Sequence, residues 1–306
     1  MKKWRAFPHN AGSYLFRCTV VMLLYIVGGI IMRFIVLILR LAVLFSALLL
    51  WTTIATNVRA EDAVKVCDDI SPWPPYSYPS PIGNRETVPK QTGAMVGFLG
   101  DLFKEVGLKY TLTLRPWKRC LEEVIKSSGP GEFEVVINAS FSSERAKDYH
   151  ISKPIYRTTP GIFYSVDAYP AGLNLRSRSD LKKYKICGVR GYNYQEYGLS
   201  DSDIYTVAPS LKAIFRMMSK GRCEIIVSAV EVVFGTKLFG EQIAPNNVRS
   251  VSVPGTSPET YHLLISRNSS RGFLLLKRLN IAIDKFKNDG TRDRIMAKYQ
   301  TLMDAN

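Results

Sequence analysis

The sequence predicts an α/β fold built on a parallel sheet. Three apolar stretches have the length and composition of strands: residues 64–67, 110–114 and 132–139. Between them lie a stretch with apolar residues at helical spacing, Phe98 to Val106, which ends at Gly107, and a segment that opens with Pro116. A strand–helix–strand–helix–strand order implies parallel strands with helices on both faces. The 306 residues are enough for two lobes of ordinary size.

The second half of the chain continues the alternation of strands and helices. Five more apolar stretches are typical of strands: residues 161–166, 185–189, 204–207, 248–253 and 261–267. Ser210 is in position to cap a helix over 211–218. An apolar stripe over 273–286 predicts a long helix that stops at Asp-Gly-Thr, residues 289–291, before a last helix.

The charge distribution argues against a nucleic-acid partner. The formal net charge is +15, but residues 1–60 hold seven Lys or Arg and no acid. Without these seven, 34 basic residues face 26 acidic ones, a net charge of +8 over residues 61–306. A moderate excess spread over a domain of this size gives no basic stripe. We therefore expect no nucleic-acid partner.

The first sixty residues predict a leader for export. The apolar runs at 19–32 and 41–50 are shorter than the roughly 20 residues of a membrane span. Arg33 and Arg40 precede the second run, and Val-Arg-Ala at 58–60 follows it, as in a secretory signal. We expect cleavage after Ala60 and a periplasmic location. Met32 is an alternative start, and a retained anchor is the competing interpretation.

Two polar segments at predicted strand ends carry the candidate site. The stretch 68–76 contains three prolines and follows the first strand, at the edge where open α/β sheets bind ligands. Arg145 follows the third strand among small hydroxyl residues, and a guanidinium there can hold a carboxylate in a forked pair. The alternative for Arg145 is a solvated turn in which it pairs with Glu144 or Asp148.

Several motifs occur in an order that resembles one known family. They are a Ser at 142 followed by Arg145, Ser-Lys-Pro-Ile-Tyr at 152–156, Gly97 followed by Asp-Leu at 101–102, Asp-Gly-Thr at 289–291, and Lys-Tyr at 298–299. Together they resemble the family 3 bacterial extracellular solute-binding proteins, over about residues 64–299. Ile155 is an insertion relative to the family's pattern.

The resemblance implies a two-lobe, type II periplasmic-binding-protein-like α/β fold. Each lobe would be a doubly wound, mostly parallel sheet, and two crossover segments would join the lobes. After the leader at 1–60, we expect the first part of lobe 1 at 61–159, lobe 2 at 160–260, and the end of lobe 1 at 261–306.

The resemblance also assigns ligand-binding residues in lobe 1. Arg145 would bind a ligand carboxylate, with Asn138 and Ser140 hydrogen-bonding beside it. Trp73 and Trp117 would face each other across the ligand, and two indoles bury a large flat area. Tyr76 belongs to the same aromatic group. The alternative for both tryptophans is a role in the hydrophobic core.

Lobe 2 would contribute the start of a helix at residues 191–194, directly after its predicted strand at 185–189. In the family this helix N-terminus holds the carboxylate with backbone N–H groups. Here Tyr192 and Asn193 stand where smaller hydroxyl residues are usual. The family's acid for the ligand ammonium would fall at Ala229. Glu231 would lie on the same face of the strand if the strand continued, and is either its substitute or an exposed strand-end charge.

The cysteines fit an exported chain. Four remain after the leader, with no zinc spacing and no Cys-x-x-Cys, so two disulfides are expected from three possible pairings. In the two-lobe arrangement, Cys67–Cys120 and Cys187–Cys223 each stay within one lobe, and we expect that pairing. The alternative is four buried free thiols.

The function predicted is capture of a small polar ligand, an amino acid or related carboxylate, for an inner-membrane ABC transporter permease. We expect a monomer without cofactor, metal or catalytic residues. One alternative is an enzyme on the same scaffold, such as a dehydratase or murein lyase, which needs a positioned acid and base. Another is a ligand sensor without a transporter.

Overall fold

The computed structural model describes residues 28–29, 32–33, 35–43, 45, 62–80, 90–252 and 255–304. They belong to two compact units, Met1–Glu61 and Asp62–Asn306. The described residues of the first unit are helical. No described helix combines the length and hydropathy that a bilayer crossing requires. The cleavage expected after Ala60 lies outside the described residues.

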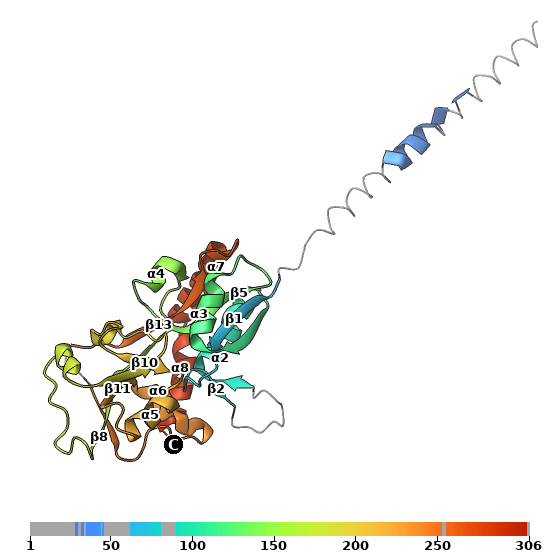
Figure 1. Ribbon diagram of the computed structural model, residues 1–306. Coiled ribbons are helices and arrows are strands. Elements are labelled where there is room, and N and C mark those ends of the chain that lie inside the picture. The colour runs from blue at the N-terminus through green and yellow to red at the C-terminus, as the bar shows by residue number, and fades with distance from the viewer. Residues whose placement is uncertain are drawn as a thin grey trace, which may run out of the picture. The chain divides into compact units, whose positions relative to one another are not determined.

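A six-stranded mixed sheet forms the core of lobe 1 (Figure 1). Its strands are β1 (Val64–Asp69), β4 (Tyr110–Arg115), β5 (Phe133–Ser140), β6 (Tyr149–Ile151), β7 (Tyr156–Thr158) and β13 (Glu259–Ser266). They lie in the order β4-β1-β5-β13-β6, and β7 also pairs with β13. β1 runs parallel to β4 and β5, as predicted, whereas β13 runs antiparallel to its three neighbours.

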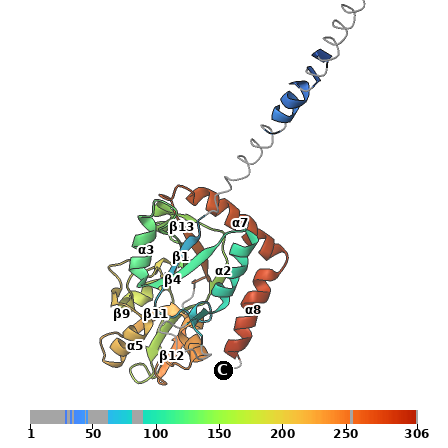
Figure 2. The ribbon, with the colours of Figure 1, turned by 90° about the vertical axis from the view of Figure 1, so that its right-hand side faces the viewer.

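Helices cover both faces of this sheet. They are α2 (Ala94–Glu105), α3 (Trp117–Ile125), α4 (Arg145–Asp148), α7 (Gly272–Asn288) and α8 (Thr291–Asp304). Successive strand residues point to opposite faces. Ile137 and Leu263 pack in the cluster that contains the apolar faces of α2 and α7, whereas Val136 and Leu264 pack in the cluster that contains α3. Figure 2 shows α3 on one side of β1 and β4, with α2 and α8 side by side on the other.

Lobe 2 contains a second mixed sheet. Its strands are β8 (Pro160–Ser165), β9 (Ile186–Val189), β10 (Tyr205–Ala208), β11 (Ile225–Ala229) and β12 (Val248–Val251), in the order β10-β9-β11-β8-β12. The helices of this lobe are η1 (Arg178–Lys183), η2 (Gln195–Tyr197), α5 (Leu211–Ser219), α6 (Val230–Phe234) and η3 (Gly235–Phe239). Ser210 caps α5 as predicted, because its Oγ accepts the N–H of Ala213 at 3.3 Å.

Two passages connect the sheets. The chain leaves the first sheet at the end of β7 and enters the second at β8, with Thr159 between them. It returns between β12 and β13. A short hairpin, β2 (Tyr78–Pro79) with β3 (Gln91–Thr92), lies beside the loop that follows β1. Tyr78 of this hairpin stacks on Phe239 of lobe 2 at 5.9 Å between ring centroids, so the lobes also touch beside the passages.

Both predicted disulfides are confirmed. Cys67 bonds to Cys120 and joins β1 to α3 in lobe 1. Cys187 bonds to Cys223 and joins β9 to the segment before β11 in lobe 2. The alternative of four free thiols is wrong.

Candidate functional site

A cavity of about 40 Å³ lies where the lobes meet. It is lined by Asp68, Asp69, Trp73, Trp117, Asn138, Ser140, Arg145, Tyr192, Asn193 and Tyr261. Tyr192 and Asn193 come from the turn after β9 in lobe 2, and the other residues come from lobe 1. The cavity thus brings together seven of the nine predicted ligand residues, and leaves out Tyr76 and Glu231.

Arg145 reaches the cavity from the short helix α4. Its Nη1 donates to the carbonyl and hydroxyl oxygens of Ser140 at 2.8 and 3.2 Å, and its Nη2 donates to the carbonyl of Gly191 at 3.1 Å. The guanidinium carbon lies 5.6 Å from the ring centre of Trp117, a cation–π distance. Burial lowers the pKa of Arg145, and the nearby Glu259 opposes that shift. The guanidinium remains charged at neutral pH.

Two adjacent carboxyl groups face the cavity at the end of β1. Asp68 is 1% exposed, and its Oδ2 accepts a hydrogen bond from Asn138 Nδ2 at 3.0 Å. Its Oδ1 has no hydrogen-bond partner among the described residues. Burial raises the pKa of Asp68 to about 7.

Asp69 is similarly buried but better satisfied. Its carboxylate accepts the N–H of Ser71 at 3.1 Å and the hydroxyl of Tyr192 at 3.2 Å. Burial raises its pKa to about 6. A buried carboxylate with a raised pKa gains most from a cationic partner, because the cation offsets the cost of removing the charge from water. The pair with Asp68 therefore forms an acidic end of the cavity.

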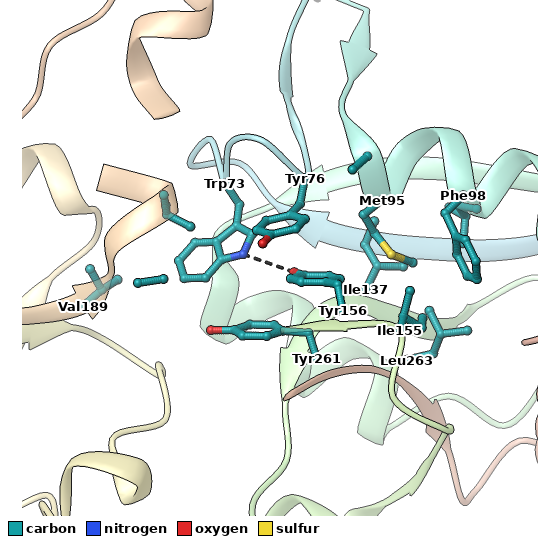
Figure 3. Packing of buried hydrophobic residues seen from close by; sticks show 14 of the residues in the cluster. Trp73, Tyr76, Met95, Phe98, Ile137, Ile155, Tyr156, Val189, Tyr261 and Leu263 are labelled. Atoms are coloured by element: carbon teal, nitrogen blue, oxygen red, sulfur yellow. Dashed lines mark hydrogen bonds between the residues drawn. The ribbon is translucent and has the colours of Figure 1, made fainter. Parts of the chain in front are cut away.

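Asn138 holds the acidic end in place. Its φ of 57° lies in the left-handed region, which asparagine tolerates better than most residues and which is often found at functional sites. Its Oδ1 accepts the hydroxyl of Tyr156 at 2.8 Å. Tyr156 Oη in turn accepts the indole N–H of Trp73 at 3.2 Å, as the dashed line in Figure 3 shows. Each group in this chain donates to the next, from the indole of Trp73 to the carboxylate of Asp68. The last donor, Asn138, thereby favours the charged form of Asp68.

A stack of three tyrosine rings lies next to this chain of hydrogen bonds. Tyr156 stacks on Tyr76 with centroids 3.7 Å apart and on Tyr261 with centroids 4.8 Å apart, and Figure 3 shows the rings in layers. Tyr261 lines the cavity, whereas Tyr76 lies behind Tyr156 and donates its hydroxyl to the carbonyl of Arg157 at 3.1 Å. Tyr76 therefore supports the aromatic wall from outside the cavity.

The helix predicted at residue 191 does not form. A turn follows β9, and the next helical segment is the three-residue η2. Tyr192 lies edge-on to Trp73 at 5.4 Å and to Trp117 at 6.2 Å. Each indole thus contacts the Tyr192 ring. Asn193 donates to Ser140 Oγ at 3.1 Å and to the carbonyl of Phe141 at 2.7 Å.

Glu231 lies in a different place from the one predicted. The expectation assumed that the strand continues past Ala229, but β11 ends there and α6 begins at Val230. The helical turn redirects the side chain, so the carboxylate accepts the N–H of Thr159 at 2.9 Å and its hydroxyl at 2.7 Å. Glu231 therefore stabilises the first passage between the lobes, which contains Thr159.

The sequence reasoning missed Asp68, Asp69 and Tyr261. The two acids had a usable signal, since adjacent carboxylates at the end of a buried first strand are costly unless they serve a purpose. Tyr261 opened a predicted strand and had no signal of its own. Among the described residues, no group of three His, Cys, Asp or Glu side chains is arranged to hold a metal.

Two α/β lobes joined by two passages, with a cavity at their junction, are the architecture of a solute-binding protein. The chain belongs to the bacterial extracellular solute-binding proteins, family 3, whose family model matches residues 71–301.

Known proteins similar to this chain agree with the family. A probable histidine-binding protein of Neisseria gonorrhoeae is 21% identical over 213 residues, which cover 68% of this chain and 74% of that protein. A histidine kinase sensor domain with similarity to periplasmic binding proteins matches with a TM-score of 0.61 at 19% identity, over 78% of this chain and 96% of its own. The arginine-, lysine-, histidine-binding protein ArtJ of Geobacillus stearothermophilus matches with a TM-score of 0.59 at 17% identity, over 78% and 95%. The predicted type II fold is confirmed.

Proposed function

We propose that this chain is an exported binding protein that closes its lobes on an amino acid with a cationic group. The observation that carries the proposal is the polarity of the cavity. Arg145 supplies a guanidinium, and Asp68 and Asp69 supply two buried carboxyl groups near it. In a ligand that has both groups, the carboxylate would bind the guanidinium and the cation would bind the carboxyl groups.

The walls suit a ligand with an apolar or planar body. The aromatic side chains of Trp73, Trp117 and Tyr261 line the cavity. Such walls exclude water and bind cations through their π-faces. The names of the similar proteins, which refer to histidine, arginine and lysine, point to the same class of ligand. We propose a periplasmic location and delivery to an inner-membrane ABC-type importer.

A thermal-shift screen tests the proposal. The protein from Asp62 onward contains both disulfides and every described hydrophobic cluster, and forms one compact unit. The screen compares L-arginine, L-lysine, L-histidine, L-glutamine and L-glutamate. A ligand at 100 times its dissociation constant adds about 2.7 kcal/mol of stability. We expect the cationic amino acids to raise the melting temperature and L-glutamate to leave it unchanged.

The Arg145→Ala variant separates carboxylate binding from general stabilisation. A hydrogen bond to a charged group contributes about 1.5–3 kcal/mol, so the variant should bind the best amino acid at least about tenfold more weakly by calorimetry. The control is Arg119→Ala, which removes an exposed arginine of α3 that pairs with Glu123 at the surface. Equal affinity of Arg145→Ala and the parent would contradict the proposal.

A second candidate function is sensing rather than transport, and the similarity to a histidine kinase sensor domain favours it. Both functions share the same ligand cavity. Uptake of radiolabelled ligand by cells that lack this chain decides between them. Reduced uptake supports the importer, and unchanged uptake supports the sensor.

A further inference from the structure

The cavity is small, and a segment of lobe 2 lies against the groups that line it. Ligand pockets usually enclose about 300–1,000 Å³, whereas this cavity measures about 40 Å³ and holds no more than a few water molecules. This segment is Gly191–Asn193, in the turn between β9 and η2.

The segment occupies the groups that would hold a carboxylate. The carbonyl oxygen of Gly191 accepts hydrogen bonds from Arg145 Nη2 at 3.1 Å and from the indole N–H of Trp117 at 2.8 Å. Gly191 has a φ of +81°, a backbone conformation that glycine adopts easily, and a Cβ at this residue would lie 3.2 Å from the Trp117 ring. Glycine thus allows a backbone carbonyl to stand where a ligand carboxylate oxygen would bind.

The same segment occupies the acidic end and the aromatic walls. The Tyr192 hydroxyl donates to Asp69 Oδ2 at 3.2 Å, as a ligand's cationic N–H would. The Tyr192 ring contacts both Trp73 and Trp117 edge-on, with interplanar angles of 83° and 86°. Edge-to-face contacts of this kind are favourable, so a ligand must replace them to enter.

We propose that Tyr192 is an internal occupant of the cleft, which competes with the ligand and thereby sets its affinity and size. This inference rests on the proposed function for the identity of the cleft. The protein with nothing added is closed on its own Tyr192. A ligand binds only the fraction of molecules in which Tyr192 has withdrawn, and its apparent affinity is reduced by that fraction.

Acrylamide quenching of tryptophan fluorescence tests the closed resting state without any ligand. From Asp62 onward the only tryptophans are Trp73 and Trp117, which are 7% and 6% exposed. We expect weak quenching in the parent and stronger quenching in Tyr192→Ala. The control is Tyr205→Ala, which removes a tyrosine of lobe 2 that is 51% exposed and should leave quenching unchanged. Strong quenching in the parent, or equal quenching in parent and Tyr192→Ala, overturns the inference.

Calorimetry with L-arginine tests the competition. Removing an occupant held by a hydrogen bond to a carboxylate and by two ring contacts should tighten binding about tenfold or more in Tyr192→Ala. Tyr192→Phe keeps the ring and loses the hydroxyl, so its affinity should lie between those of the parent and Tyr192→Ala.

The two tests fail in different ways. Weaker or unchanged L-arginine binding by Tyr192→Ala shows that Tyr192 is a wall of the ligand site, and overturns the inference. If neither protein binds any amino acid of the screen, the proposed function is wrong, and the quenching comparison still decides whether Tyr192 closes the cleft.

Discussion

Replacing Asp68 by asparagine is the most informative single change, because it should stabilise the protein and impair its binding. The Asp68 carboxyl group is 1% exposed, and one of its oxygens has no hydrogen-bond partner among the described residues. Asparagine has nearly the same shape, and its side-chain oxygen can still accept the hydrogen bond from Asn138. The change therefore removes a buried charge while it leaves the packing intact.

The magnitude follows from the pKa of Asp68, which is raised from 3.8 to about 7 in the folded protein. A carboxyl group with a raised folded-state pKa holds its proton more tightly in the folded protein than in the unfolded chain. Stability is therefore greatest at low pH and falls as the pH rises toward the folded-state pKa. Between pH 5 and pH 8, this group alone should lower the free energy of unfolding by about 2–3 kcal/mol.

Melting temperatures at pH 5 and pH 8 test this expectation. For a protein of this size, a change of about 2–3 kcal/mol in the free energy of unfolding shifts the melting temperature by roughly 5–10 °C. The melting temperature of the Asp68→Asn variant, relative to that of the parent, should therefore be higher by this amount at pH 8 than at pH 5. Asp101→Asn, on the exposed face of α2, is the control and should follow the parent at both values.

The binding measurement completes the test. At pH 8 the parent has an ionised Asp68 and the variant has none, so L-arginine should bind the variant at least about tenfold more weakly. An equal difference in melting temperature at pH 5 and pH 8 would refute the reasoning, because it would mean that Asp68 does not titrate in the folded protein.

Two further changes test the stability of the lobes. Glu134 has a fully buried side chain and pairs with Arg271. Arg271→Met leaves this carboxylate unpaired and should lower the free energy of unfolding by about 3–5 kcal/mol, measured with urea. The double variant that also carries Glu134→Gln should recover part of the loss, and additive losses would contradict a buried pair. Replacing both Cys187 and Cys223 by alanine should lower the free energy of unfolding by about 4 kcal/mol, and an added reductant should then affect the variant less than the parent.

Local sequence signals predicted the elements of the fold well. Apolar runs located the strands because a strand buried on both faces is mostly apolar. Five of the eight residues of Phe133–Ser140 are apolar, and seven of the eight are buried. Ser210 and the Asp-Gly-Thr break located helix ends because capping depends on neighbours in the chain. The disulfides were predictable once the lobes were assigned, since each pair lies within one lobe.

The candidate site was less predictable, because it depends on contacts between distant segments. The position of Glu231 depends on whether β11 ends at Ala229 or continues to residue 231. Nothing in the local sequence pattern decides this. The position of Tyr192 depends on how deeply a turn of lobe 2 enters lobe 1. Asp68 and Asp69 were visible as charges, but their burial follows from the sheet order, which places β1 between β4 and β5.

The position of β13 constrains how the chain acquires its native structure during synthesis. β13 (Glu259–Ser266) pairs with β5, β6 and β7, so the central ladder of lobe 1 is completed by a segment that emerges after all of lobe 2. Chains are made from the N-terminus, and pairings distant in sequence form late. Until residue 266 has left the ribosome, the edge of β5 that pairs with β13 stays open, and the sheet of lobe 1 is incomplete.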